Sequence, residues 1–451
     1  MASRRASDEG ASVSRGEPVS LGAERVRALE AERQSLVSIL GTLRNAGPAT
    51  RLDLERETHL GRAVIVDRLA TLSAFGLVEE NGVGRSIGGR APKLLRFRAE
   101  AGRLLVANMD GSTVGIGLAD LSGRLLLEHY EDVAPDLPSP SLLERLETLF
   151  AWALGEGGAP LWGIGLGAPG TVDFEQEVQL AVPRFATSPD WNESRLVERL
   201  AVRFGAPVFA RSAVQTATMG EITALPPERA FDLIFVDLGP SISTGLVSGG
   251  QLLRGAQGIA GQMGHIYMGE GSMLVCGCGN VGCLQTVAGC EAIAREGERA
   301  ASEGQSPALA AILARSGAVT VDDIGTASRL GDPFSADILA QAGRLVGTTL
   351  AGLVNIFNPA TLVIGGDLAQ TGDICLAAIR EAVYRHAQPL ASRDLSILRS
   401  RMGRSAGLVG AATVVAEELF ASHFLEAWIT SGTPLAHPKV LTFLQAAAGA
   451  A

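Results

Sequence analysis

Residues 262–285 read QMGHIYMGEGSMLVCGCGNVGCLQ, the most specific stretch of this chain. His265 is followed by Cys276, Cys278 and Cys283, and the glycines between them allow a short loop to fold back on a metal ion. One imidazole and three thiolates suit tetrahedral Zn²⁺ with no open coordination position. The stretch therefore predicts a structural zinc site on these four residues. A chance cluster is disfavoured, because C-x-C-x₄-C with an upstream histidine is far more specific than a lone cysteine pair.

The composition is typical of a soluble globular protein. A length of 451 residues allows two or three domains with a large core, and a hydrophobic share of 47% excludes wholesale disorder. No apolar run approaches the roughly 18 residues that a membrane helix needs. We therefore expect a cytoplasmic protein with no membrane partner and no disulfide framework. Cys290 and Cys375, outside the cluster, are expected to be buried free thiols.

Charge is unevenly distributed along the chain. Residues 1–100 hold 16 Lys and Arg against 13 Asp and Glu, whereas residues 101–451 hold 22 against 35. A mildly basic front is thus joined to an acidic body. Such asymmetry favours a nucleic-acid-binding module fused to a domain of another kind.

Three helices are predicted after a polar tail, residues 1–26, that we expect to be disordered. The first ends before Gly47-Pro48, and Thr50 can cap a second short helix with Asp53 at its third position. A tight turn at 59–61 then leads into a third helix over 62–75. This order predicts a helix-turn-helix.

A β-hairpin is predicted to follow the third helix. Its strands begin at Gly76 and at Lys93, and residues 81–98 contain five basic side chains and no acid. This pattern indicates a wing, whose tip at Gly88-Gly89-Arg90 could place a guanidinium in a minor groove. The alternative is an ordinary hairpin with a solvated basic face.

The third helix is expected to read the major groove. Arginines there could bind guanine or phosphate, and a valine could contact a thymine methyl group. Asp67 could orient Arg68 or accept from a cytosine amine, or it could simply form a surface ion pair with Arg62 or Arg68. The predicted DNA contacts, including two in the wing, are Arg62, Val64, Asp67, Arg68, Arg85 and Arg90.

The remainder alternates strands and helices, which predicts an α/β body. The expected divisions are a tail over 1–26, a winged helix-turn-helix over 27–98, a two-lobed body over 101–421 with lobes of about 101–228 plus 405–421 and 229–404, and a C-terminal extension over 422–451.

Three motifs together resemble one family. They are the zinc signature at 264–284, the helix-turn-helix followed by Gly88-Gly89-Arg90, and the stretch 353–359, LVNIFNP. The chain, from residue 27 to about 421, resembles the ROK family of repressors, open reading frames and sugar kinases, and its N-terminal part is similar to that of the repressors. The resemblance implies an actin-like, hexokinase-like fold in which two α/β lobes enclose a sugar cleft.

The residues that the family's kinases need for phosphoryl transfer are replaced in this chain. Phosphoryl transfer needs a carboxylate that accepts a proton, and glycine loops that approach the nucleotide phosphates. The family's Glu-Asn-Asp is matched by Arg-Ser-Ala at 211–213, so that Ala213 takes the place of the base. In the loop 239–243, Pro240 lacks an N–H donor, and Asp367 adds charge near the expected polyphosphate. We therefore expect no catalytic residue, no bound ATP and no enzyme activity.

The sugar contacts implied by the family are also altered. Two glutamates are replaced by Gln262 and Gln285, which keep the shape but lose the charge and gain amide donors. One interpretation is that the cleft binds a different neutral ligand through Ser212, Gln262, His265 and Gln285. The other is that the cleft has lost its ligand and serves as a dimerisation body.

The sequence thus predicts a DNA-binding transcriptional regulator, expected to be a repressor in carbohydrate metabolism with a sugar-type effector. The alternatives are a sugar kinase with an appended domain and an effector-independent DNA-binding protein. A double-stranded DNA operator and a homodimer or homotetramer follow from the resemblance. The zinc loop would hold Gln262, His265 and Gln285 at the cleft wall.

Overall fold

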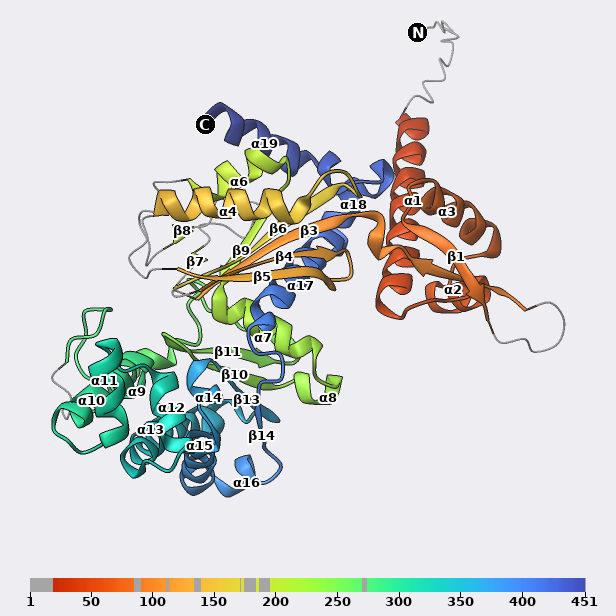
Figure 1. The fold of residues 1–451 in the computed structure, drawn as a ribbon. Coiled ribbons are helices and arrows are strands. Elements are labelled where there is room, and N and C mark those ends of the chain that lie inside the picture. The colour runs from red at the N-terminus through yellow and green to blue at the C-terminus, as the bar shows by residue number, and fades with distance from the viewer. Residues whose placement is uncertain are drawn as a thin grey trace, which may run out of the picture. The chain divides into compact units, whose positions relative to one another are not determined.

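The computed structural model describes most of the chain in two compact units (Figure 1). The first comprises Met1–Arg98 with Leu425–Gly432, and the second comprises Ala99–Phe424 with Thr433–Ala451. The described residues are 19–84, 91–110, 113–133, 139–170, 172–173, 184–185, 195–269 and 274–450.

Three helices form the larger part of the first unit: α1 (Val19–Asn45), α2 (Arg51–Thr58) and α3 (Arg62–Ala74). Helix α1 begins at Val19, so the prediction of a disordered tail is wrong for residues 19–26. Residues 1–18 lie outside the described residues. The predicted cap of α2 is confirmed, because the Thr50 hydroxyl accepts from the Asp53 N–H and the Asp53 carboxylate accepts from the Thr50 N–H.

The hairpin after α3 pairs β1 (Val78–Val83) with β2 (Lys93–Phe97) in antiparallel register. Ala49 adds a short bridge to β2, since its N–H donates to the Leu95 carbonyl at 3.0 Å and its carbonyl accepts the Leu95 N–H at 2.9 Å. The buried side chains beneath this arrangement come from all three helices and from β2, and they include Leu36, Ile39, Leu40, Leu54, Ile65, Leu69, Leu72 and Leu95.

A segment near the C-terminus also belongs to the first unit. Helix α18 (Ser422–Trp428) is followed by the 3₁₀ turn η3 (Ile429–Ser431), and Trp428 and Ile429 are fully buried. Gly432 ends the segment with φ +72°, and its α-carbon lies against the ring of Phe75 at the end of α3. Residues 425–432 therefore contribute to the unit that carries α3.

The second unit contains two sheets with the same strand order. In the first lobe the order is β5-β4-β3-β6-β9, and in the second it is β12-β11-β10-β13-β14. Each sheet begins with antiparallel pairs and ends with two parallel pairs. The strands are β3 (Arg103–Met109), β4 (Thr113–Asp120), β5 (Leu125–Asp132), β6 (Leu161–Ala168), β9 (Val208–Ser212), β10 (Leu233–Leu238), β11 (Ile242–Ser248), β12 (Gln251–Leu252), β13 (Thr361–Gly365) and β14 (Ser396–Arg399).

Helices cover both faces of the first-lobe sheet. One face packs on α4 (Ser139–Leu154) and α6 (Leu196–Phe204), and α19 (Pro438–Ala450) contributes Phe443 and Leu444 to that side. The other face packs on α17 (Ser405–Phe420). Two short strands, β7 (Val172–Asp173) and β8 (Arg184–Phe185), form a separate pair. Helix α7 (Ala213–Thr223) packs against α17 and contacts strands of both sheets. The remaining helical pieces are η1 (Ala99–Ala101), η4 (Pro434–Ala436) and α8 (Pro227–Ala230).

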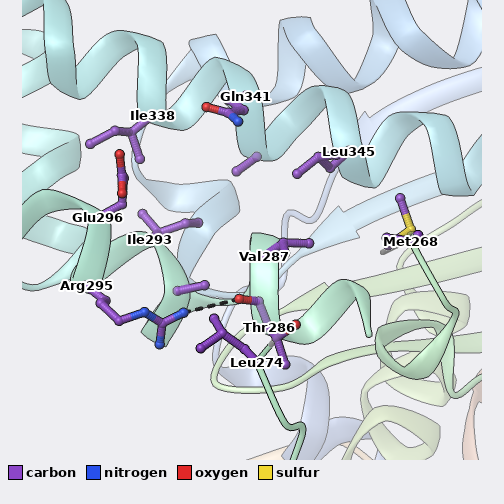
Figure 2. Close-up of a pocket in the computed structure, with 13 residues that line it drawn as sticks. Met268, Leu274, Thr286, Val287, Ile293, Arg295, Glu296, Ile338, Gln341 and Leu345 are labelled. Atoms are coloured by element: carbon purple, nitrogen blue, oxygen red, sulfur yellow. Dashed lines mark hydrogen bonds between the residues drawn. The ribbon is translucent and has the colours of Figure 1, made fainter. Parts of the chain in front are cut away.

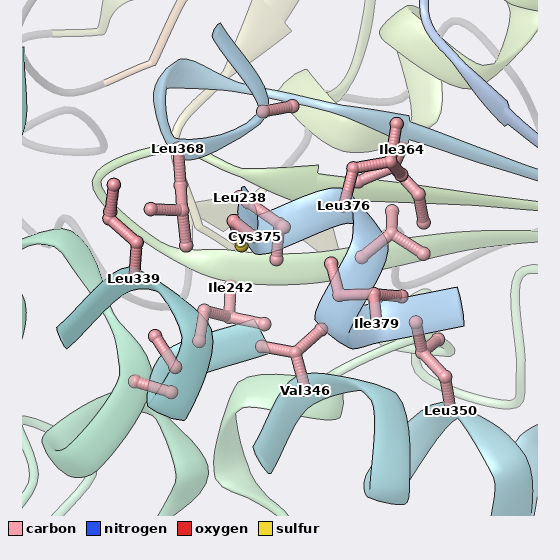
Figure 3. Close-up of a cluster of buried hydrophobic side chains, with 14 of the residues drawn as sticks. Leu238, Ile242, Leu339, Val346, Leu350, Ile364, Leu368, Cys375, Leu376 and Ile379 are labelled. Atoms are coloured by element: carbon pink, nitrogen blue, oxygen red, sulfur yellow. The ribbon is translucent and has the colours of Figure 1, made fainter. Parts of the chain in front are cut away.

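The second lobe has its core between its sheet and a pair of long helices. Figure 3 shows Val346 and Leu350 of α13 (Pro333–Phe357) facing Ile379 of α15 (Asp373–His386). The other helical elements are η2 (Met263–His265), α9 (Leu284–Ala288), α10 (Cys290–Ser302), α11 (Pro307–Ser316), α12 (Val321–Arg329), α14 (Asp367–Gln370) and α16 (Pro389–Ser392).

Within the described part of the chain, no single helix is both long and apolar enough to cross a membrane. One bent pair, Ser405–Phe420 with Ser422–Ser431, has the length and composition when taken together.

Replacement of Gly432 by alanine should destabilise the first unit by about 1–3 kcal/mol. A Cβ atom there would lie 2.6 Å from Phe75 Cδ1, in a backbone conformation that favours glycine. Hydrogen exchange of peptides from α1 and α3 in the full chain measures the effect. Gly331→Ala is the matched control, because Gly331 also has positive φ (+97°) but no atom within 4 Å of the added Cβ. Equal exchange of α3 in both variants would contradict a role for residues 425–432 in this unit.

Candidate functional site

The four residues expected to bind zinc lie together. The ligand atoms of His265, Cys276, Cys278 and Cys283 are all within 4.8 Å of one another. His265 Nδ1 lies 3.5 Å from Cys276 Sγ, and Cys278 Sγ lies 3.7 Å from Cys283 Sγ. A tight turn brings the cysteines together, because the Cys276 N–H donates to the Asn280 carbonyl at 2.8 Å. The structure thus contains a Cys₃His cluster, and all three thiols are free.

The donor set of this cluster fits a soft divalent cation. Cys276 and Cys283 are buried, whereas His265 and Cys278 are exposed. Burial raises the pKa of Cys283 to about 12, while the backbone N–H of Asn280 lowers the pKa of Cys278. A bound cation would supply the positive charge that a buried thiolate needs. With three sulfurs and one imidazole nitrogen, its coordination would be complete and offer no open position.

The position that the family resemblance assigns to the catalytic base lies at the start of α7. Ser212 is the N-cap residue, and its hydroxyl accepts the Gln215 N–H at 3.4 Å. Ala213 follows as the first helical residue. Ser212 is buried and already serves as a helix cap, and the methyl group of Ala213 has no atom that could accept a proton.

The two glutamines beside the metal cluster have different surroundings. The Gln285 side-chain carbonyl accepts the Ile242 N–H at 2.6 Å, and its NH₂ group donates to the Pro240 carbonyl at 2.8 Å. Both ends of this amide are thus engaged by backbone. Gln262 is half-buried before η2, and the described part of the chain shows no hydrogen bond from its side chain. His265 turns Nδ1 toward Cys276, which leaves Nε2 as its second polar atom.

Three carboxylates, Asp110, Asp237 and Asp367, influence one another beside the loop 239–242. Burial, together with Asp110 and Asp367, raises the pKa of Asp237 to about 7. Burial and Asp110 likewise raise the pKa of Asp367. A polyphosphate would meet this negative charge. Sequence reasoning missed Asp237, although an acid within the apolar strand LIFVDL was a usable signal.

A buried ion pair also escaped the sequence analysis. Arg211 Nη2 lies 2.8 Å from Glu418 Oε1, and Arg254 Nη2 lies 3.8 Å from the same oxygen. Burial and the neighbouring Arg254 lower the pKa of Arg211 to about 10, so that it remains a cation at neutral pH. Its sequence signal was an arginine at the position where the family has glutamate. The pair joins β9 to the end of α17.

A pocket of about 520 Å³ lies between α10 and α13 (Figure 2). Its walls are mostly apolar, with Val287, Ile293, Ile338 and Leu345 among them, and sequence reasoning did not predict it. At its edge Arg295 Nη2 donates to the Thr286 carbonyl at 3.2 Å.

Helix α3 buries one face and exposes the other. Arg62, Val64 and Asp67 are exposed, as the sequence analysis required of DNA contacts. Val66, which was not predicted, is 49% exposed. Arg62, Val64 and Asp67 thus lie among the exposed residues of the helix, opposite Ile65, Leu69 and Leu72.

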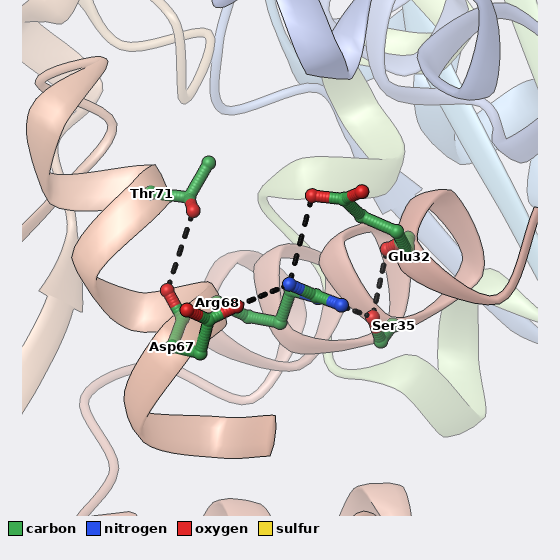
Figure 4. Close-up of polar contacts among 5 residues, drawn as sticks. All are labelled: Glu32, Ser35, Asp67, Arg68 and Thr71. Carbon is green, nitrogen blue, oxygen red and sulfur yellow. Dashed lines mark hydrogen bonds and ion pairs between the residues drawn. The ribbon is translucent and has the colours of Figure 1, made fainter. Parts of the chain in front are cut away.

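Arg68, by contrast, is directed at α1 (Figure 4). Its Nε donates to the Ser35 hydroxyl at 2.9 Å, and its Nη1 lies 3.6 Å from Glu32 and pairs with Asp67. The structure therefore shows the Asp67–Arg68 ion pair that the sequence analysis had left open. Arg68 ties α3 to α1.

The three basic side chains of the hairpin that the structure describes each pair with an acid. Lys93 pairs with Glu80, and Arg96 and Arg98 pair with Glu79 at 2.6 and 3.3 Å. These glutamates lie just before the window in which the sequence shows no acid. The two predicted wing contacts, Arg85 and Arg90, lie outside the described residues.

Both repressors and sugar kinases are similar to this chain. A xylose repressor from Bacillus spizizenii is 25% identical over 382 residues, which cover 84% of this chain and 92% of the repressor. A glucokinase from Streptomyces coelicolor is 30% identical, but it covers 70% of this chain and 98% of its own length. A crystal structure of a ROK family transcriptional regulator, a homolog of the E. coli MLC protein, matches 92% of this chain and 99% of its own with a TM-score of 0.67 and 24% identity, which supports the fold.

The repressors thus match most of the chain, whereas the glucokinase lacks a counterpart for much of the rest. The sequence profile of the ROK family matches residues 108–418, more than half of the chain and nearly all of the two lobes. On that match, this chain belongs to the ROK family.

Proposed function

We propose that this protein is a DNA-binding transcriptional regulator of the repressor type, in which a ROK body without kinase activity responds to a sugar-like ligand. The observation that carries the proposal is the joining of a three-helix and hairpin unit, with an exposed face on α3, to lobes that have Ala213 at the base position. The greater coverage by a repressor than by a glucokinase supports it.

DNA recognition uses the exposed residues of α3 in a major groove. Arg62 supplies a guanidinium for guanine or phosphate, Val64 and Val66 supply apolar contacts, and Asp67 accepts from a base amine or orients its neighbours. Arg68 does not contact DNA in this proposal, because its side chain fixes α3 to α1. Arg85 and Arg90 extend the contact from the wing. A homodimer on a palindromic operator would present two copies of α3.

The body binds a neutral sugar or sugar derivative without phosphorylating it. Gln262 and the Nε2 atom of His265 are the polar groups left for such a ligand, whereas the Ser212 hydroxyl caps α7. The absence of a base at Ala213 disfavours phosphoryl transfer. The acids Asp110, Asp237 and Asp367 beside the loop 239–242, of which Asp237 has its pKa raised to about 7, disfavour a polyphosphate that brings no cation.

A zinc ion would be held by His265, Cys276, Cys278 and Cys283. It would supply a cross-link between the segment that contains η2 and the turn before α9. Such a site stabilises the loop and performs no chemistry.

Arg62→Ala should weaken specific DNA binding by roughly tenfold without loss of folding, because Arg62 is exposed and begins α3. Binding to a site obtained by selection from random duplexes, at fixed salt, measures the effect. Arg315→Ala, an exposed arginine of α11 in the other unit, is the control. Failure of the wild-type protein to select any sequence would overturn the proposal.

Cys278→Ser should abolish bound zinc and lower the unfolding temperature of the second unit by roughly 5–10 °C. Cys278 is exposed, so the exchange of sulfur for oxygen disturbs no core packing. Metal analysis of purified protein is the readout. Cys375→Ser, a thiol outside the cluster, should keep its zinc. A wild-type protein that contains no zinc refutes this site.

Calorimetric titration with neutral pentoses and hexoses should detect binding, and Gln262→Ala should weaken it about 5–10-fold through loss of a hydrogen bond. Gln251→Ala, at the exposed strand β12, is the control. No ATP should be consumed with any of these sugars. If none of them binds, the protein is an effector-independent DNA-binding protein, and measurable sugar phosphorylation would make it a kinase.

A further inference from the structure

The loop between β10 and β11 is held by side chains from one junction, that between α9 and α10. Gln285 of α9 binds the loop twice, through the Pro240 carbonyl at 2.8 Å and the Ile242 N–H at 2.6 Å. Cys290, the first residue of α10, directs its thiol to the Gly239 carbonyl at 3.1 Å. The backbone of Gly239, Pro240 and Ile242 is therefore held by two side chains.

A glutamine is the residue that this arrangement requires. Its carbonyl oxygen faces a backbone donor and its NH₂ group faces a backbone acceptor, so that both ends are satisfied. A glutamate, which the family has at this position, could accept from Ile242 but would place a second oxygen against the Pro240 carbonyl. The exchange of glutamate for glutamine thus matches the geometry of the loop, in addition to removing a charge from the cleft.

Two glycines make room for the amide. A Cβ atom at Gly289 would lie 2.5 Å from Gln285 Nε2, and one at Gly264 would lie 3.2 Å from Gln285 Oε1 and collide with the Ile242 carbonyl. Gly264 immediately precedes His265 of the metal cluster. The slot for Gln285 is therefore built by the same loop that carries the cluster.

The short helix that carries Gln285 begins at a member of the cluster. Cys283 is the N-cap residue of α9, and its carbonyl accepts the Thr286 hydroxyl at 2.8 Å. The next N–H, that of Leu284, donates to the Ile266 carbonyl at 3.0 Å, one residue after His265. A displacement of Cys283 and His265 would therefore also move the backbone of Gln285.

We propose that Gln285 is a positioning residue, by which the metal loop fixes the conformation of the loop 239–242 instead of contacting the effector. This inference rests on the proposed zinc site. The fixed loop has its Ile242 N–H occupied by a side chain, in the place where a kinase of this family would offer backbone donors to phosphate. Loss of the metal should therefore loosen a loop that contains none of the metal ligands.

Hydrogen exchange of a peptide spanning 239–243, in the full-length zinc-loaded protein, tests the proposal. Gln285→Ala and Gln285→Glu should each speed exchange of this peptide by roughly 3–10-fold, because each removes at least one of the two bonds. Gln285→Met keeps the volume of the side chain and should behave as Gln285→Ala does. Gln251→Ala, at the exposed strand β12 of the same sheet, is the control and should leave the peptide unchanged.

Removal of zinc by a chelator supplies the second arm. It should speed exchange of the 239–243 peptide in the wild type but add little in Gln285→Ala, where the connection is already broken. A peptide within α13 serves as the internal reference. If Gln285→Ala leaves the exchange of the 239–243 peptide unchanged, Gln285 does not fix this loop. If Gln285→Ala speeds the exchange but chelation does not, the metal does not act on the loop through Gln285. Metal analysis of the same samples reports failure of the zinc site separately.

Discussion

The contact between α7 and α17 is the constraint on which the two-lobed body depends. Backbone meets backbone there, because Gly220 lies against the Ala406 carbonyl and Gly410 lies against the Thr216 carbonyl, in each case too closely for a side chain. Helix α7 starts after its N-cap Ser212, and α17 follows the last strand of the second lobe and covers the first-lobe sheet. Larger residues at either glycine would separate these two helices and disturb the contacts of α7 with both sheets.

The same helix connects several features that look independent in the sequence. The N-terminal part of α17 contacts α7, its Glu418 neutralises the buried Arg211 next to Ser212, and the chain then continues into residues 425–432 of the first unit. A buried arginine is tolerated only when its charge is paired. The replacement of the family's glutamate by Arg211 therefore required an acid on a neighbouring element, and α17 provides it. The charge of Arg211 is thus balanced by an acid on the helix that packs against its sheet.

Local patterns were predictable from the sequence, and long-range partners were not. The Thr50–Asp53 cap and the four-residue metal cluster depend on short spacings, and the structure shows both groups together. The ion pairs of Arg68 with α1 and of Arg96 with Glu79 depend on which helix or strand lies opposite, which no spacing reveals. The assignment of residues 425–432 to the first unit failed to emerge for the same reason, because their apolar residues could have packed anywhere.

Gln285 illustrates how a conservative change can alter the role of a site. As a charged glutamate, the side chain would be available to a sugar hydroxyl and would repel a carbonyl oxygen. As an amide it satisfies one donor and one acceptor of the backbone, each worth about 1 kcal/mol net, and the cost of leaving either unpaired in a buried position is larger. These free energies favour hydrogen bonds from the Gln285 amide to the loop 239–242 over contact of the amide with a ligand. The two residues that our proposal leaves for an effector, Gln262 and His265, belong to the same segment as the Cys₃His cluster, so that the proposed ligand recognition and the fixation of the loop would share one scaffold.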